Sequence, residues 1–179
     1  MKGSRLLSTF LVASALFAGV IARPVQDMAP PAELKNIDWI LGTWTGVGKG
    51  MGISGEAKIT SEAKLAKDLD GRWINYTATY TMEGMGTLSG RMMLTYDENL
   101  KKYTGWWFDS MSATVLDLKG DLKDGVLTLE DNEVSDPMMG DTAYKIIMKK
   151  TSTGMDLQVM MKAGDQWVVA AEQAYTAKK

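Results

Sequence analysis

Hydrophobic and polar residues alternate with a period of two along most of this chain. The pattern is clearest in residues 73–82, where one face carries Ile74, Tyr76, Ala78, Tyr80 and Met82. The opposite face carries Trp73, Asn75 and three threonines. Successive side chains of a β-strand point to opposite sides, so this stretch is predicted to be a half-buried strand. Residues 144–149, 157–161 and 167–176 repeat the alternation.

Turn signals separate these runs, for example Asp70-Gly71, Lys123-Asp124-Gly125 and Thr153-Gly154. About ten strands are predicted, at residues 43–49, 54–66, 72–82, 87–96, 101–109, 112–119, 125–131, 141–150, 155–162 and 166–176. Short strands joined by tight turns favour an antiparallel meander, and closure of the sheet removes its exposed edges. The predicted fold class is therefore all-β, an antiparallel up-and-down barrel of about ten strands.

Helical spacing occurs in only one well-defined place, before the first strand. Leu34, Ile37 and either Ile40 or Leu41 recur at intervals of three to four residues, and Gly42 follows them. This spacing predicts a short amphipathic helix that covers one end of the barrel.

The N-terminus has the features of a secretory signal peptide. Lys2 and Arg5 precede a short apolar run, and small residues lead to a predicted cleavage site after Ala22. Residues 23–33 contain three of the four prolines and are expected to form a flexible linker, with one barrel domain over residues 34–179. We therefore expect a secreted or periplasmic protein with no stable membrane insertion after cleavage. A retained membrane anchor is the alternative, although the apolar run is short for one.

Composition excludes several classes of function. The chain has no histidine and no cysteine, which excludes histidine-dependent triads, thiol nucleophiles and most transition-metal sites. No metal and no cofactor is therefore predicted. The mature chain would carry 18 Lys and Arg against 22 Asp and Glu, and this balance argues against nucleic-acid partners. The fourteen methionines favour adaptable apolar packing or an apolar ligand pocket over a copper site.

Four motifs follow one another in a fixed order: LGTWTGVG (41–48), LDGRW (69–73), GTLSGRMMLTYDENLKKYTGWWFDSM (86–111) and DPMMGD (136–141). In this order the chain resembles an uncharacterised bacterial family of domains of unknown function, described as lipocalin-like. The resemblance implies a calycin-type barrel and no established reaction. Met92 and Met93 depart from the family pattern, in which small residues more often follow the arginine that corresponds to Arg91. The chain is more distantly similar to haem-binding nitrobindin barrels, but it lacks the histidine that would hold the iron, so that activity is not implied.

The stretch GWWFDSMSA (105–113) supplies the candidate site. If it is a strand, Trp107, Asp109 and Met111 share one face, which would give the barrel interior an aromatic wall, a carboxylate and a thioether. The alternative is that Trp107 and Met111 fill the core and Asp109 accepts a hydrogen bond from the backbone or from an arginine. A buried carboxylate needs such a partner.

Arginine usage suggests that partner. Arg72 and Arg91 are the only arginines in the predicted domain. The planar guanidinium suits a bidentate contact with Asp109 or with the acid group of a ligand. Arg72 follows the Asp70-Gly71 turn, so the alternative that it is exposed to solvent is equally compatible with the sequence. The predicted ligand-binding residues are Arg91, Asp109, Trp107, Met111, Arg72, Tyr80 and Trp44.

The leading hypothesis is an exported, non-enzymatic barrel that binds a small hydrophobic or amphipathic ligand, such as a lipid or fatty acid. The alternatives are an enzyme on the same fold that uses Asp109 with tyrosine or arginine partners, and a barrel filled by its own side chains that acts as an interaction module. Oligomeric state does not follow from the sequence.

Overall fold

The computed structural model describes residues 29–131, 134–136 and 140–178. The predicted signal peptide, its cleavage site and most of the predicted linker lie outside the described residues, as do three residues of the DPMMGD motif. Among the residues that are described, no helix is both long enough and apolar enough to cross a membrane.

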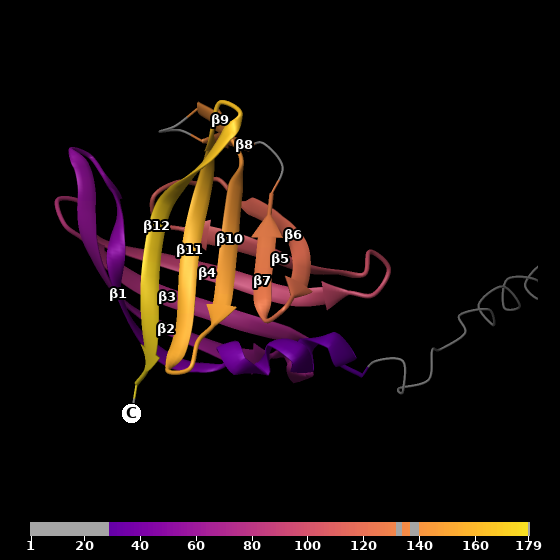
Figure 1. Ribbon diagram of the computed structural model, residues 1–179. Helices are drawn as coiled ribbons and strands as arrows, with labels where there is room; N and C mark the ends of the chain where they lie inside the picture. The colour runs from indigo at the N-terminus through magenta and orange to yellow at the C-terminus, as the bar shows by residue number, and fades with distance from the viewer. Residues whose placement is uncertain (1–28, 132–133, 137–139, 179) are drawn as a thin grey trace, which may run out of the picture.

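The chain forms a closed, antiparallel barrel of ten strands, which confirms the predicted fold class (Figure 1). Neighbouring strands follow the order β1-β12-β11-β10-β7-β6-β5-β4-β3-β2. Their bounds are β1 Gly42–Gly52, β2 Gly55–Asp68, β3 Trp73–Met82, β4 Gly86–Asp97, β5 Lys102–Asp109, β6 Leu116–Lys123, β7 Val126–Glu130, β10 Tyr144–Lys150, β11 Gly154–Ala163 and β12 Gln166–Ala177. The pairing of β1 with β12 closes the barrel.

Two details differ from the prediction. The strand expected at residues 112–119 lies four residues later, as β6, because residues 110–115 form a loop held by Asp109. A short hairpin, β8 (Val134–Asp136) with β9 (Gly140–Thr142), interrupts the meander between β7 and β10. Its strands are three residues each, too short to produce a visible alternation.

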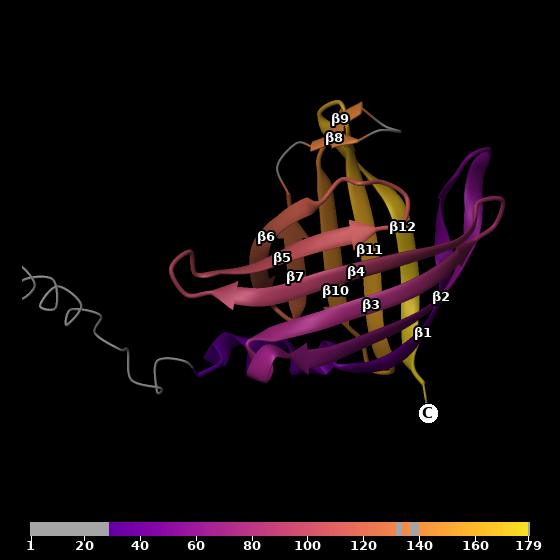
Figure 2. The ribbon, with the colours of Figure 1, turned by 180° about the vertical axis from the view of Figure 1, so that it is seen from behind.

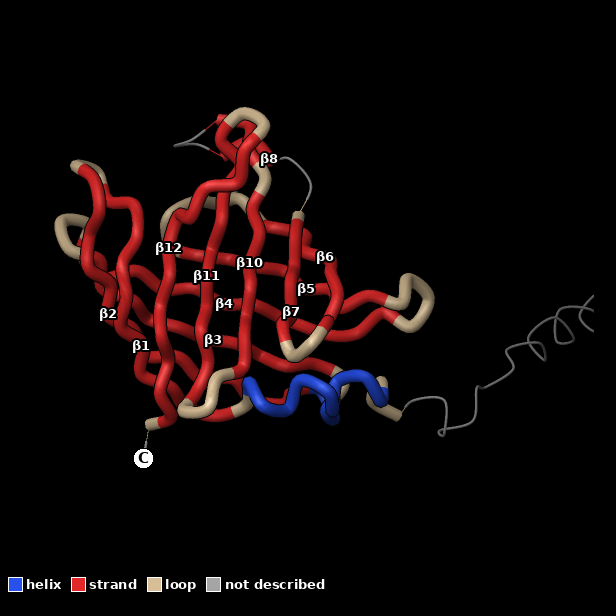
Figure 3. Tube along the Cα trace, viewed as in Figure 1, coloured by secondary structure: helices blue, strands red, loops and turns tan. Residues whose placement is uncertain are grey.

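The predicted helix is present, but it is a 3-10 helix, η2 (Ala32–Ile40). Leu34, Ile37 and Ile40 are all buried, and their spacing of three residues matches the three residues per turn of this helix type. η2 lies across one end of the barrel (Figure 3). The indole of Trp44, on β1, donates a hydrogen bond of 2.9 Å to the Ile40 carbonyl and fixes the helix to the barrel. We call this end the plugged end.

A single main core fills the barrel next to η2. Alternate residues of the strands point inward, as the 73–82 pattern predicted. Ile74, Tyr76 and Ala78 are buried, whereas Thr79, which points outward, is exposed. The largest buried side chains, which include Met92, Leu94, Leu118, Leu127, Leu129 and Met148, join Ile37 in this cluster. A second short 3-10 turn, η3 (Leu69–Gly71), joins β2 to β3.

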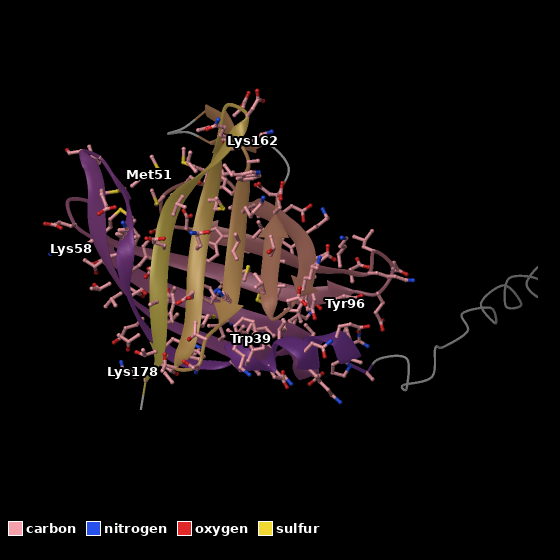
Figure 4. The ribbon with its side chains drawn as sticks, viewed as in Figure 1. Trp39, Met51, Lys58, Tyr96, Lys162 and Lys178 are labelled. Carbon is pink, nitrogen blue, oxygen red and sulfur yellow. The ribbon has the colours of Figure 1, made fainter. Side chains whose placement is uncertain are left out.

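The opposite end of the barrel carries the β1–β2, β3–β4 and β11–β12 turns and the β5–β6 loop (Figures 1 and 2). We call it the mouth end. Figure 4 shows Met51 and Lys162 at this end, whereas Trp39 and Lys178 lie at the plugged end. Both β5 and β7 run toward the mouth end, so their last residues lie near it.

Candidate functional site

A group of polar side chains lines the barrel interior between the core and the mouth end. Ser61 of β2 hydrogen-bonds through Oγ to Gln173 Oε1 at 2.6 Å and to the Tyr175 hydroxyl at 2.9 Å, both on β12. Gly46 of β1 lies between these two strands. A Cβ at Gly46 would run into Ser61 Oγ and would lie 2.7 Å from the Tyr175 ring. Gly46, the second glycine of the LGTWTGVG motif, therefore makes room for this contact.

Two tyrosines of β3 continue the polar group. Burial raises the pKa of the Tyr76 hydroxyl well above its ordinary value, with further contributions from the charge of Tyr175 and a hydrogen bond to it. Burial also raises the pKa of Tyr80 to about 12, helped by the nearby charges of Asp109 and Tyr175. Both hydroxyls stay neutral at physiological pH and can donate hydrogen bonds.

Trp107 and Asp109 form the third part of the wall, at the end of β5. The Trp107 indole donates to Asp109 Oδ2 at 2.9 Å, and its ring lies 5.6 Å from that of Tyr76. Gly90 of β4 allows this position, because a Cβ there would lie 2.5 Å from Trp107 Cζ2. Together, Tyr76, Tyr80, Trp107 and Asp109 present aromatic faces, a hydroxyl donor and a carboxylate to the interior.

Asp109 also holds the loop that follows it. Its Oδ1 accepts hydrogen bonds from the backbone amides of Met111 at 2.8 Å and Ser112 at 3.2 Å. Asp109 thus accepts hydrogen bonds from the backbone, as in the alternative given for it in the sequence analysis. Among the described residues, no lysine or arginine forms an ion pair with Asp109. The carboxylate of Asp109 therefore accepts hydrogen bonds but is not paired with any described cation.

Four of the predicted ligand residues lie away from this wall. Met111 is in the β5–β6 loop and 42% exposed, because the strand ends at Asp109. Arg91 is exposed on the outer face of β4, where it is paired with Thr77 and Phe108. Arg72 follows η3 between β2 and β3, and Trp44 anchors η2 at the plugged end. Arg91 therefore cannot hold a ligand inside the barrel.

Sequence reasoning did not single out Ser61, Gln173 and Tyr175. β12 also contains an extra residue that changes the face of the residues before it: Val159 pairs with Ala171, but Met160 pairs with Val169, so Ala170 has no partner. Such a bulge reverses the inside and outside positions along the strand. Strict alternation over residues 167–176 would place Trp167 and Val169 on the same face as Ala171 and Tyr175, whereas Trp167 stacks against Lys145 on the outside. Asp131, at the end of β7, was also missed, and it is buried.

An open hollow of about 570 Å³ lies on the outer face of β2 to β5, with Arg91 at its edge. Exposed or half-exposed residues, among them Thr77, Ser89 and Phe108, surround it. Asp109 also lines this hollow, but its carboxylate oxygens bond to the inward Trp107 indole and to the backbone amides of Met111 and Ser112. We therefore place the candidate site on the inner wall.

The inner wall changes in exposure from one end of the barrel to the other. Along β12, Tyr175 is only 2% exposed, whereas Gln173 and Ala171, nearer the mouth end, are half-buried. Along β5, Tyr103 is 4% exposed, whereas Trp107 and Asp109 are half-buried. Along β5 and β12, therefore, the interior is filled at the plugged end and reached by solvent nearer the mouth end, whereas Ile59 of β2 and Met82 of β3 stay buried at the mouth end.

Solved structures of two other proteins share this fold. Rv2717c from M. tuberculosis is 13% identical, with a TM-score of 0.57 over 84% of this chain and 99% of that chain. The S-type phycobiliprotein lyase CPES from Guillardia theta is 12% identical, with a TM-score of 0.54 over 82% of this chain and 92% of that chain. At these identities the likeness shows the fold alone. No curated protein matches the sequence.

A protein-family model matches nearly the whole barrel of this chain, and this match tests the resemblance that the four motifs suggested. The family model covers residues 29–176, which include η2 and almost all of β12. The chain therefore belongs to the family described as protein of unknown function (DUF1579).

Proposed function

We propose that the barrel binds a small molecule with an apolar body in its mouth-end half, against Tyr80, Trp107 and Asp109. The observation that carries this proposal is the increase in exposure toward the mouth end along the inward faces of β5 and β12. Side chains that point into a barrel and are still reached by solvent border a space that a ligand can enter. The filled core below them supplies a rigid floor.

The composition of this wall suits a small ligand. Aromatic faces from Trp107 and Tyr80 offer apolar contact area, while the Tyr80 hydroxyl and Asp109 fix orientation through hydrogen bonds. Ser61, Gln173 and Tyr175 satisfy one another and hold the floor in place. A related fold in a phycobiliprotein lyase agrees with a barrel that acts on another molecule, although it identifies no ligand here.

A pair of tryptophan substitutions on β12 tests the location. Ala171 points inward and packs with Met82 and Ile59, whereas Ala174 is exposed on the outer face. We expect wild-type protein to bind 4-phenylbutanol in isothermal titration calorimetry, and Ala171→Trp to weaken that binding at least about tenfold by filling the space, a loss of about 1.4 kcal/mol or more. Ala174→Trp adds the same ring outside and should bind as the wild type does.

Circular dichroism spectra establish that both variants keep the barrel. The proposal fails if the wild type does not bind the alcohol, or if the two folded variants bind it equally well.

A further inference from the structure

The inner wall at the mouth end has an unbalanced charge. Strand lysines such as Lys49, Lys58, Lys64 and Lys119 occupy outward positions, and several form ion pairs there with surface carboxylates. Arg91 is also outside. Within the described residues, the inward positions of the mouth-end half therefore contain no cation.

Carboxyl groups are present at the same end. Asp109 closes β5 with its charge unpaired by any described cation, and it lies near enough to Tyr80 to raise the pKa of that hydroxyl. Asp131 follows β7, in which Leu127 and Leu129 face inward, and continues that alternation. It is only 7% exposed, and its Oδ2 has no hydrogen-bond partner. Asp109 thus faces the mouth-end interior with no described basic group beside it, and Asp131 is a second carboxyl group at the same end.

The remaining polar and aromatic groups reinforce this polarity. Tyr76 and Tyr80 hold their protons strongly, so they act as neutral hydroxyls, and the faces of Trp107 and Tyr76 present negative π density. A carboxylate placed here would meet Asp109 without a counter-ion. An ammonium group would meet a carboxylate and aromatic faces, both of which stabilise it.

From this arrangement we infer that the site selects amphipathic ligands with a cationic or neutral polar group, and rejects carboxylates such as fatty acids. This selectivity rests on the proposed function. It replaces the expectation of an arginine-anchored acid group, because both described arginines lie away from the inner wall. Asp109 is the specificity-determining residue: it accepts a hydrogen bond from the ligand's ammonium or hydroxyl group.

The test uses three probes that share one apolar body: 4-phenylbutylamine, 4-phenylbutanol and 4-phenylbutyrate. Their dissociation constants for the wild type are measured by calorimetry at pH 7 and low ionic strength. We expect the amine to bind at least about tenfold more tightly than the acid, with the alcohol between them, since Asp109 attracts an ammonium group and repels a carboxylate. An acid that binds as tightly as the amine would overturn the selectivity and leave the proposed function intact.

Asparagine variants assign the selectivity to a residue. Asp109→Asn should bring the amine-to-acid ratio close to one. Asp156→Asn removes the same charge from an exposed position on β11 and should leave the ratio unchanged. The wild-type ranking does not depend on how well either variant folds. An unchanged ratio in folded Asp109→Asn would refute its assigned role, whereas wild type that binds none of the three probes would refute the proposed function itself.

Discussion

Gly48→Ala is expected to destabilise the barrel by about 3 kcal/mol, because it opens the seam at which the sheet closes. Gly48 lies on β1 opposite Gln173 of β12. An added methyl group would run into the backbone carbonyl of Glu172 and would lie 2.7 Å from the Gln173 Cα. Backbone atoms of a paired strand cannot rotate away as a side chain can. The two strands would have to separate locally, and the hydrogen bonds of the seam would be lost.

Urea denaturation followed by tryptophan fluorescence measures this effect. Val47→Ala is the matched control, since Val47 is the neighbouring residue and is 59% exposed on the outer face. It should change the free energy of unfolding by less than about 0.5 kcal/mol. If Gly48→Ala unfolds within 1 kcal/mol of the wild type, the described approach of β1 to β12 is wrong.

Asp131 is expected to make the barrel less stable as pH rises from about 4 to about 7. Burial raises the pKa of this carboxyl from 3.8 to about 6, against two backbone hydrogen bonds that lower it. Between these values the folded state holds a proton that the unfolded state has released. The stabilisation is complete below the unfolded pKa and is lost as pH rises through the folded one. A shift of this size corresponds to about 3 kcal/mol.

Asp131→Asn isolates this contribution from those of other carboxylates. The amide carbonyl can still accept the Tyr144 N–H, which donates to Asp131 at 2.5 Å, but the side chain no longer titrates. We expect the difference in unfolding free energy between variant and wild type to shift in favour of the variant by about 2–3 kcal/mol from pH 4 to pH 7. Urea denaturation at four pH values measures it. A difference that stays constant with pH would contradict the raised pKa of Asp131.

Period-two alternation was enough to predict the fold class because most strands have one face in the core. Residues 73–82 show this well, since Ile74, Tyr76 and Ala78 are buried in the order expected. The position of β6 was not predicted correctly, because Ser110, Ser112 and Thr114 alternate with apolar residues in a stretch that is a loop. The deciding interaction there is a cap formed by Asp109, and alternation carries no information about it.

The candidate site was only partly predictable for a similar reason. Trp107, Asp109 and Tyr80 were assigned to inward faces because they lie in strands without bulges. The extra residue at Ala170 reversed the faces of the first residues of β12, so Trp167 was assigned to the inner face although it lies outside. The preference of arginine for carboxylates suggested Arg91, but strand register places Arg91 outside and gives Asp109 an indole and two backbone amides instead.

We expect a ligand to bind in the mouth-end interior, next to Trp107 and Asp109. Titration of 15N-labelled protein with 4-phenylbutylamine, followed through the tryptophan indole N–H signals, tests it most directly. Trp107 donates to Asp109 at the proposed site, Trp44 donates to Ile40 at the plugged end, and Trp106 lies 5.5 Å from Trp73 on the outer face. Binding at this site should give a saturable shift of the Trp107 signal and leave the Trp44 and Trp106 signals unmoved. A saturable shift of Trp106 or Trp44, with Trp107 unchanged, would contradict it.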